Sequence, residues 1–541
     1  MDRSVSWWDC GEFIATGWLL QVGHPPGAPT YQLLSHLFML LSFGNPMLVA
    51  PLSNALSAFA GGLTVGILYL TILEFTSNRS PSPSHLPAAI GALCYLFCDT
   101  AWFSAVESEV YSLAMLFCAL DLWLALRYRH TGNSRLLLLL ALLLGLGVGV
   151  HFMTLLTVPA LLFIAFPVLV HRSRWGLVIP PMVLFFALGL STYLVIPIRA
   201  AANPPINEGR PDTAESFMQY MKREQYPKAP LYPRMWRERD EANWSDWTYG
   251  LDGVAGNAVY YINYQLGYMY GRYLMYNFIG RENLKNHHVV VFVLPFLLGL
   301  WGLLRHRRRS RWGFWTVMLL FLFGGAILNL YLNHPCYEPR ERDYAYILSF
   351  YAFAIWIGVG ADEIGYRLRV KGYSWRWLLL LAPLLLAWGN WSDHDRHDCH
   401  SVHDIAMGHL QSCGQNAILI TLGDNDTFPL WYLQQVERQR TDIDIYNINL
   451  TGGAQTMQLI DSSLGRRPVY FSQYFVDRFG KYYEGRLRCE GFCWQLLPDG
   501  APVVQSHSHP IEWHITECEY IDPVSSRFLD IWHRNLQSCG I

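Results

Sequence analysis

The stretch Leu136–Val170 reads LLLLLALLLGLGVGVHFMTLLTVPALLFIAFPVLV, and its apolar residues form an almost unbroken run. A helix needs about 20 apolar residues to cross the hydrocarbon core of a bilayer, so this run is too long for a single span. The glycines of Gly147-Val148-Gly149-Val150-His151 mark the best place for a turn within it. The stretch therefore predicts two short membrane helices that meet near His151.

Further apolar runs of similar length occur on both sides of this stretch. The candidate spans are 47–75, 86–103, 110–127, 135–150, 152–170, 176–197, 288–304, 312–332, 346–366 and 375–391. Composition agrees, because 52% of the residues are hydrophobic and only 15% are charged, against about 25% charged in soluble domains. The net charge of −2 gives no indication of nucleic acid as a partner. We therefore expect a mainly α-helical polytopic protein embedded in a lipid bilayer.

Basic residues are concentrated in alternate loops between the candidate spans. These loops contain Arg79, Arg127 with Arg129, Arg172 with Arg174, Arg305 to Arg311, and Arg367 to Arg376. Lysine and arginine in short loops favour the cytoplasmic side. The opposite, outer face then receives residues 99–109, His151, 198–287, 333–345 and the tail from about 392. Every polar motif described below falls on that face.

The N-terminal segment combines acidic and aromatic residues in Trp7-Trp8-Asp9-Cys10-Gly11-Glu12, followed by His24-Pro25-Pro26-Gly27. Its apolar stretches 13–22 and 30–43 are short and predict two helices at the outer interface, with a re-entrant hairpin as the alternative. A carboxylate near a bilayer is costly unless it has a function or a partner. Asp9 and Glu12 are therefore candidates for a general base and its support, facing a hydroxyl substrate, or else solvated acids of an interfacial loop.

The C-terminal part has the pattern of a small α/β domain. Ala417–Thr421 predicts a buried strand, Thr427–Arg440 a helix and Ile443–Leu450 a second strand, which together form a βαβ unit. The six cysteines after residue 398 could pair on an outer face or remain free thiols. The expected regions are an outer acidic segment at 1–46, membrane helices at 47–197, an outer polar segment at 198–287, membrane helices at 288–391 and an outer α/β domain at 392–541.

Two outer segments carry charged residues with two interpretations each. Glu107 and Glu109 precede a predicted span, where they either cap its helix or line the same cavity as Asp9. In the loop 333–345, Arg340 and Arg342 alternate with three acids. The planar guanidinium of arginine suits bidentate contact with a phosphate, whereas a self-satisfied cluster of ion pairs would explain the same residues.

The segment Gly423-Asp424-Asn425-Asp426-Thr427-Phe428-Pro429 is a candidate for metal binding. An Asp-x-Asp pair at a strand end can hold a divalent metal that bridges a sugar nucleotide diphosphate. Asp426 or Thr427 as a helix N-cap, with Pro429 in the first turn, explains the same residues without metal. The histidines at 394, 397, 400 and 403 fit structural or exposed positions better than a metal site. A divalent metal is therefore possible, but no residue is assigned to it.

The ordered motifs resemble those of a known family of multi-span membrane proteins. They are Trp8-Asp9-Cys10-Gly11-Glu12-Phe13-Ile14, Gln21 to Pro29, Glu107 to Leu113, Asn203 to Glu208, Arg223 to Tyr226, Arg340 to Tyr344, Asp393 to Arg396 and Gly423 to Tyr432. The animal member of the family is a protein O-mannosyltransferase that modifies plexins, and the family is similar to the GT-C-like glycosyltransferases. The resemblance extends from Ser6 to about Leu450.

The resemblance implies a membrane glycosyltransferase that moves a sugar, expected to be mannose, from a polyprenyl-phosphate donor to a Ser or Thr hydroxyl of an acceptor protein. It implies Asp9 as the base, with contributions from Glu12, His24, Glu107, Glu109, Arg340 and Arg342. The variant looks bacterial, which predicts an inner-membrane protein with its motifs on the periplasmic side. Relatives carry a membrane helix before the Trp-Asp motif, so we also expect that a first span is missing here. The alternatives are a transporter or flippase of a lipid-linked sugar and a non-catalytic membrane scaffold.

Overall fold

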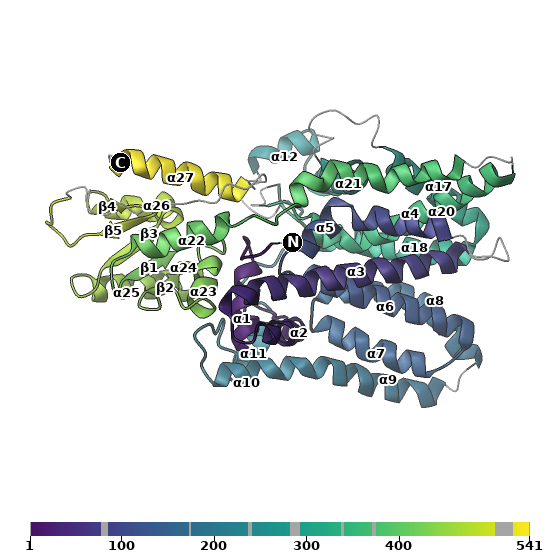
Figure 1. The fold of residues 1–541 in the computed structure, drawn as a ribbon, viewed down its shortest axis with the longest axis horizontal. Helices are drawn as coiled ribbons and strands as arrows, with labels where there is room; N and C mark the ends of the chain where they lie inside the picture. Colours follow the sequence, from purple (N-terminus) through teal and green to yellow (C-terminus); the bar gives the residue numbers. More distant parts are fainter. Residues whose placement is uncertain are drawn as a thin grey trace.

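The computed structural model describes residues 2–76, 85–172, 175–235, 241–281, 293–336, 340–370, 375–503 and 523–539. Within these ranges, six helical segments are long and apolar enough to cross a membrane. They are Pro46–Thr76, Val110–Thr131, Phe152–His171, Trp175–Ala201, Arg311–Leu332 and Asp343–Leu368. In Figure 1 these helices lie side by side as one bundle, with a smaller α/β unit at one end. The predicted fold class, a mainly helical multi-span protein with a small α/β domain, is confirmed.

The first half of the bundle follows the predicted spans. Its elements are η2 (Pro46–Leu48), α3 (Val49–Thr76), α4 (His85–Leu96), α5 (Asp99–Val106), α6 (Val110–Thr131), α7 (Arg135–Val148), η4 (Phe152–Thr157), α8 (Val158–Arg172), α9 (Trp175–Leu190), η5 (Ser191–Leu194) and α10 (Val195–Ala201). The predicted span 86–103 is broken, since α4 and α5 meet at a bend of 63°. The predicted turn near His151 is confirmed, because α7 ends at Val148 and η4 starts at Phe152.

Glycines let two of these helices pack closely. A Cβ on Gly189 of α9 would lie 2.5 Å from the carbonyl oxygen of Leu142 in α7. Only hydrogen fits at such a crossing, so the small residues let the two backbones approach and gain van der Waals contact.

The second half of the bundle is built around one deeply buried helix, α20 (Ile347–Val370), whose apolar 18-residue window is 89% buried. The helices around it are α17 (Leu294–Arg309), α18 (Arg311–Gly324), α19 (Ala326–Leu332), η8 (Asp343–Tyr346), η9 (Trp375–Leu380) and α21 (Leu381–His394). Burial this complete means that α20 faces other helices, whereas the exposed apolar faces of α9 and α21 are available to lipid.

Ion pairs join the ends of three helices where the basic loops were predicted to be cytoplasmic. Arg305 pairs with Glu363 at 2.8 Å, and Arg309 pairs with Asp362 at 2.5 Å and donates to the carbonyl oxygen of Thr76. Figure 1 shows this end of α3, α17 and α20 far from the α/β unit. The basic loops and the polar motifs therefore lie at opposite ends of the bundle.

Shorter helices cover the end of the bundle that faces the α/β unit. They are α1 (Cys10–Leu19), α2 (Pro29–Met39), η1 (Leu40–Ser42), α11 (Ala214–Met221), α12 (Glu241–Thr248), α13 (Gly253–Tyr260), the π-helical η7 (Tyr261–Gly271) and α14 (Arg272–Ile279). The two predicted N-terminal helices are thus present as α1 and α2. Much of the segment 198–287 is helical, and aromatic stacking among Trp244, Tyr260 and Tyr264 orders part of it.

The α/β unit contains one five-stranded sheet of order β2-β1-β3-β5-β4. Its elements are α22 (Ser401–Ser412), β1 (Ile418–Thr421), α23 (Phe428–Gln435), β2 (Asp444–Asn447), α24 (Ile448–Thr451), α25 (Gly453–Ser463), β3 (Val469–Ser472), α26 (Gln473–Phe479), η10 (Gly480–Tyr483), β4 (Leu487–Glu490), β5 (Cys493–Leu496) and α27 (Pro523–Cys539). Strand β1 pairs in parallel with β2 and β3, while β5 pairs antiparallel with β3 and β4. The predicted βαβ unit is confirmed as β1-α23-β2.

Helix α1 connects the bundle to the α/β unit (Figure 1). It packs against α23 so closely that a Cβ on Gly11 would lie 2.5 Å from the carbonyl oxygen of Phe428. A hydrogen bond at 2.6 Å from the backbone N–H of Trp8 to Oδ1 of Asn425 joins the same two regions. The acidic N-terminal motif therefore lies at the contact between the helical bundle and the α/β unit.

Candidate active site

A cavity of about 830 Å³ lies where the bundle, the N-terminal segment and the α/β unit meet. Its polar wall contains five carboxylic acids drawn from four separate parts of the chain, namely Asp9, Glu12, Glu109, Glu208 and Asp424. Its apolar wall comes from membrane helices and includes Phe152, Leu156, Leu328 and Leu332. The cavity therefore joins a surface suited to a lipid chain with a surface suited to polar chemistry.

Asp9 stands at the N-terminus of α1, where its carbonyl oxygen accepts the first helical hydrogen bond from the N–H of Phe13. Its side chain is turned toward the cavity instead of capping the helix. Oδ2 of Asp9 lies 3.4 Å from Nη2 of Arg340, and both side chains are 18% exposed. The carboxylate is therefore partly shielded from solvent and still accessible to a ligand.

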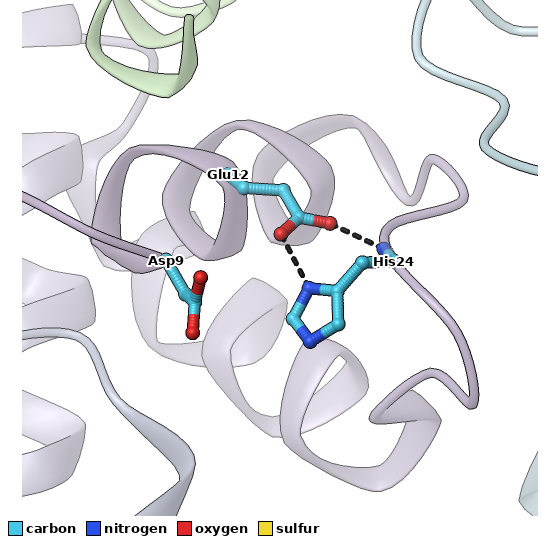
Figure 2. A group of neighbouring side chains, drawn as sticks. All are labelled: Asp9, Glu12 and His24. Carbon is cyan, nitrogen blue, oxygen red and sulfur yellow. Dashed lines mark hydrogen bonds and ion pairs between the residues drawn. The ribbon is translucent and has the colours of Figure 1, made fainter. Parts of the chain in front are cut away.

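Glu12 and His24 form a tight pair beside Asp9, as Figure 2 shows. Oε2 of Glu12 lies 2.6 Å from Nδ1 of His24, and Oε1 accepts from the backbone N–H of His24 at 2.5 Å. Burial opposes charge on His24, but the adjacent Glu12 carboxylate raises the pKa of this histidine well above its usual value. A Cβ on Gly23 would collide with the Glu12 carboxylate, so a larger residue there would displace the carboxylate from His24.

Arg340 is held by aromatic faces as well as by Asp9. Its guanidinium carbon lies 4.4 Å from the ring centre of Trp8 and 4.7 Å from that of Tyr344. Burial alone would lower the pKa of Arg340, but Tyr344 and Asp9 raise it above its usual value. A guanidinium fixed between two rings in this way keeps its charge and presents a defined face to the cavity.

Arg342 also lines the cavity and supports the same loop. Its backbone N–H donates to the hydroxyl of Tyr273 at 3.0 Å, and Nη1 donates to the hydroxyl of Tyr344 at 2.5 Å. The two described acids of this loop have partners outside it, since Glu341 pairs with Arg272 at 2.8 Å and Asp343 accepts from Thr100. Among the described residues, the loop is therefore not a closed cluster of ion pairs.

The two candidate acids before α6 have different surroundings. Glu107 is buried away from the cavity, where it accepts from Ser6 at 2.6 Å and pairs with Arg396 at 3.1 Å. Glu109 lines the cavity, and its Oε2 has no hydrogen-bond partner among the described residues. Burial and then Asp9 raise the pKa of Glu109 well above its usual value. The structure thus brings Glu109 to Asp9, as one interpretation predicted, but not Glu107.

Two cavity acids were not among the predicted site residues. Glu208 is brought in by a short bridge in which the N–H of Val22 donates to Ile206 and the N–H of Glu208 donates to Val22, each at 3.1 Å. Burial, together with the charge of Glu12, raises its pKa well above the usual value. The signal for Glu208 was its place at the end of the motif Asn203-Pro204-Pro205-Ile206-Asn207-Glu208, which had no chemical role of its own.

Asp424 is the other added acid, and it comes from the predicted Asp-x-Asp segment. Burial and the charge of Asp9 raise its pKa to about 6. Asp426 turns away and accepts from the N–H of Leu422 at 2.9 Å and from the hydroxyl of Ser472. The two aspartates therefore do not converge as a metal pair.

Thr427 is the N-cap residue of α23, with Pro429 in the first turn, as the capping interpretation predicted. Its side chain does not cap the helix, however, because its hydroxyl donates to the carbonyl oxygen of Gly423 at 2.7 Å.

The histidines at 394, 397 and 403 have structural contacts. His394 is buried and contacts the carbonyl oxygens of Asn390 and Asp99 at 2.7 and 3.0 Å. His397 is exposed and pairs with neighbouring aspartates, and His403 lies 3.1 Å from Glu437. His394 is therefore structural, while His397 is exposed. Within the described ranges, the residues placed to hold a metal ion are Asp9, Glu12 and His24.

Comparisons with family models confirm the resemblance inferred from the motifs. Residues 9–173 match the protein O-mannosyl-transferase TMEM260 N-terminal domain, and residues 402–455 match the TMEM260-associated domain 2. The first match begins at Asp9 and includes Glu12, His24 and Glu109. The second includes Asp424, so both matched regions contribute to the cavity wall.

Two named relatives align with most of this chain. Protein O-mannosyl-transferase tmem260 of Dictyostelium discoideum is 23% identical over 488 residues, which are 83% of this chain and 55% of the relative. Protein O-mannosyl-transferase TMEM260 of Mus musculus is 23% identical over 469 residues, which are 82% of this chain and 60% of the relative. The chain therefore spans a little over half the length of these relatives.

Solved structures with some similarity include two membrane proteins at 11% identity. ArnT from Cupriavidus metallidurans bound to undecaprenyl phosphate has a TM-score of 0.47, covering 91% of this chain and 94% of that one. The Archaeoglobus fulgidus oligosaccharyltransferase in complex with Zn and sulfate has a TM-score of 0.48, covering 89% of this chain and 66% of that one.

Proposed function

We propose that this chain, whose two matched regions are those of the protein O-mannosyl-transferase TMEM260, transfers a sugar from a polyprenyl-phosphate donor to a Ser or Thr hydroxyl of a protein. We propose mannose as the sugar. The observation that supports this most is the position of Asp9 beside Arg340 in a cavity that has both a polar and an apolar wall. A base and a phosphate-binding cation are the two groups that such a transfer needs at one place.

In the proposed reaction, Asp9 accepts the proton of the acceptor hydroxyl. The acceptor oxygen forms a bond to the anomeric carbon as the bond from that carbon to the phosphate oxygen breaks, with inversion. Polyprenyl phosphate leaves as an anion, and the proton remains on Asp9 until solvent removes it. Because the leaving group carries its own negative charge, no general acid is required. Arg340 stabilises the charge that develops on the phosphate.

The ion pair between Asp9 and Arg340 gives the reaction an order. Arg340 lies against Asp9 at 3.4 Å. A donor phosphate that attracts the guanidinium would weaken this contact and leave the Asp9 carboxylate open to the acceptor hydroxyl. Donor binding would thereby prepare the base before the acceptor hydroxyl arrives. Glu12 and His24, which lie beside Asp9, would position it.

The apolar side of the cavity explains how a membrane enzyme would use a hydrophilic sugar. Phe152 and Leu156 come from the segment that begins the span 152–171, and Leu328 and Leu332 come from the end of the span 311–332. We propose that the first prenyl units lie along these side chains while the remaining lipid stays in the bilayer. The sugar phosphate at the end of the lipid can then reach the cavity while its prenyl chain stays in apolar surroundings.

We propose that the cavity opens on the periplasmic side of a bacterial inner membrane. This is supported by the separation of the polar motifs from the basic ends of α3, α17 and α20. Reporter proteins fused after Arg308 should indicate the cytoplasm, and those fused after Pro233 and Asp424 should indicate the outer side. A cytoplasmic signal at Asp424 would place the cavity on the wrong side for this proposal.

The function is tested most directly by the mass of the products. Outer-face proteins are taken from cells with the intact gene, with the gene deleted, and with Asp9→Asn expressed at the parental level. We expect hexose additions on Ser or Thr in the first sample and their loss in the other two. Additions that persist without the gene, or that are unaffected by Asp9→Asn, would contradict the proposed reaction.

A further inference from the structure

We propose that Asp9, Glu12 and His24 form a binding site for a divalent transition-metal ion in the wall of the cavity. One oxygen of each carboxylate and one ring nitrogen of His24 lie within 4.8 Å of one another. Figure 2 shows the three side chains turned toward a common space, with Asp9 on one side and the Glu12–His24 pair on the other. Ligands of these kinds bind metal ions at about 2.0–2.2 Å, so atoms that lie this close together can share one ion.

The charge around this space is the second, independent observation. Glu208 lines the same cavity and is 6% exposed, and neither of its carboxylate oxygens has a hydrogen-bond partner among the described residues. Oε2 of Glu109, which is 4% exposed, is also without a partner there. A buried carboxylate without a partner is costly, and a nearby cation offsets that cost. Arg340 is already occupied by Asp9 and two aromatic rings.

The donor set indicates the class of ion. Carboxylates alone suit Mg²⁺ and Ca²⁺, whereas an imidazole added to two carboxylates favours ions such as Mn²⁺ and Zn²⁺. Three protein ligands leave coordination positions open toward the cavity, as in catalytic metal sites. Glu208 and Asp424 also contribute to the electrostatics of the site, because each interacts with Asp9, Glu12 and His24.

The competing explanation is a closed ion pair between protonated His24 and Glu12. That pair satisfies both side chains, since the 2.6 Å contact joins Nδ1 and Oε2. The same wall also contains Lys222, Arg223, Arg340 and Arg342, yet among the described residues both carboxylate oxygens of Glu208 and Oε2 of Glu109 still have no hydrogen-bond partner. A divalent ion that replaces the shared proton would add positive charge to the wall that contains Glu208 and Glu109.

Asp9 can serve this site and the reaction together. Coordination needs one of its oxygens, and Oδ2, which lies 3.4 Å from Arg340, would accept the proton once the donor phosphate attracts the guanidinium. The position of the ion beside Arg340 would add a second cation for the donor phosphate, and this role rests on the proposed function. The binding of the ion does not rest on the proposed function, because it is measured without donor or acceptor.

The test uses the full chain purified in detergent and stripped of metal with a chelator. Mn²⁺ is added, and bound metal is measured by equilibrium dialysis and elemental mass spectrometry. We expect about one Mn²⁺ per chain in the parent and more than about tenfold weaker binding in Glu12→Gln and in His24→Gln. His403→Gln is the matched control, because His403 also lies between two carboxylates but outside the cavity. It should bind as the parent does.

Spectroscopy of the parent keeps the test decisive if a variant fails to fold. Pulsed electron paramagnetic resonance of bound Mn²⁺ should show coupling to an imidazole nitrogen, and Mn²⁺ should raise the melting temperature of the parent. Absence of binding at millimolar Mn²⁺, equal binding in both variants, or bound Mn²⁺ without nitrogen coupling would each overturn the site. A chain that binds Mn²⁺ but transfers no sugar would contradict the proposed function alone.

Discussion

Arg340 and Asp9 are 331 positions apart in the chain, yet Nη2 of Arg340 lies 3.4 Å from Oδ2 of Asp9. The contact brings the loop before α20 to the start of α1, with the ring of Trp8 completing the enclosure of the guanidinium. A cation and a base are thereby held in contact inside a cavity that reaches membrane helices.

Removing the carboxylate of Asp9 should affect transfer more than any other single change. Asp9→Asn keeps the shape but cannot accept a proton, so turnover should fall by about 10²- to 10⁴-fold. Glu12→Gln should cost less, because Glu12 acts through His24 and Asp9. Asp444→Asn, on the surface of the α/β unit, is the control. Turnover is measured with purified chain, a polyprenyl-phosphate mannose and a Ser/Thr peptide. Parental rates in both Asp9→Asn and Glu12→Gln would refute the mechanism.

Changes at Arg340 should affect use of the donor. Arg340→Ala should raise the KM for the lipid-phosphate donor and lower kcat, since the guanidinium binds the phosphate and stabilises its developing charge. Arg340→Lys should rescue only in part, because an ammonium lacks the planar fork and stacks less well on Trp8 and Tyr344. Arg342→Ala should have a smaller effect. The acceptor KM serves as the internal reference, and unchanged donor kinetics in both alanine variants would remove this loop from donor binding.

Substitution of Glu107 should lower the stability of the protein, whereas substitution of Glu109 should change its kinetics. Glu107→Gln weakens the buried pair with Arg396 and should destabilise the protein by about 1–3 kcal/mol, while the folded fraction keeps the parental KM values. Glu109→Gln changes the cavity wall and should alter the kinetics. Melting temperature and initial rates are compared in the same detergent. A kinetic defect in Glu107→Gln at full stability would restore a role for Glu107 in substrate binding.

The stability that His403 provides should depend on pH. Burial alone would lower the pKa of His403, but Asp404 and Glu437 raise it to about 9, against about 6.5 for an unfolded chain. The folded state therefore binds the proton more tightly, so this stabilisation is complete below about pH 6.5 and is lost as pH rises through about 9. The melting-temperature difference between the parent and His403→Gln should shrink from pH 6 to pH 10. A difference that is constant over this range would contradict the assignment.

Substitution of Asp121 tests whether the protein transfers a sugar or transports a lipid-linked sugar. This residue is buried in the span 110–131, and neither of its carboxylate oxygens has a hydrogen-bond partner among the described residues. A transporter would use such a charge, whereas the proposed transferase has its chemistry in the cavity. Asp121→Asn should therefore leave sugar transfer unchanged and leave the melting temperature unchanged or higher. Loss of transfer in a folded Asp121→Asn protein, with loss of lipid-linked sugar movement across vesicles, would favour the flippase hypothesis.

The sequence alone determined the architecture and one side of the site. Long apolar runs such as Leu136–Val170 must be membrane helices, because an unpaired backbone is too costly in lipid. The hydrophobic and polar pattern after Ala417 determined the βαβ unit in the same local way. Asp9, Glu12 and His24 could be chosen beforehand because they are close in sequence and belong to one ordered motif.

Only the tertiary structure decided which distant residues share the cavity. Glu107 and Glu109 are two positions apart, and such residues share a face in a regular extended strand, yet Glu107 pairs with Arg396 while Glu109 lines the cavity near Asp9. Asp424 reaches the cavity because Gly11 lets α1 approach α23. These contacts cross hundreds of positions, and they depend on how whole elements pack, which no local pattern encodes.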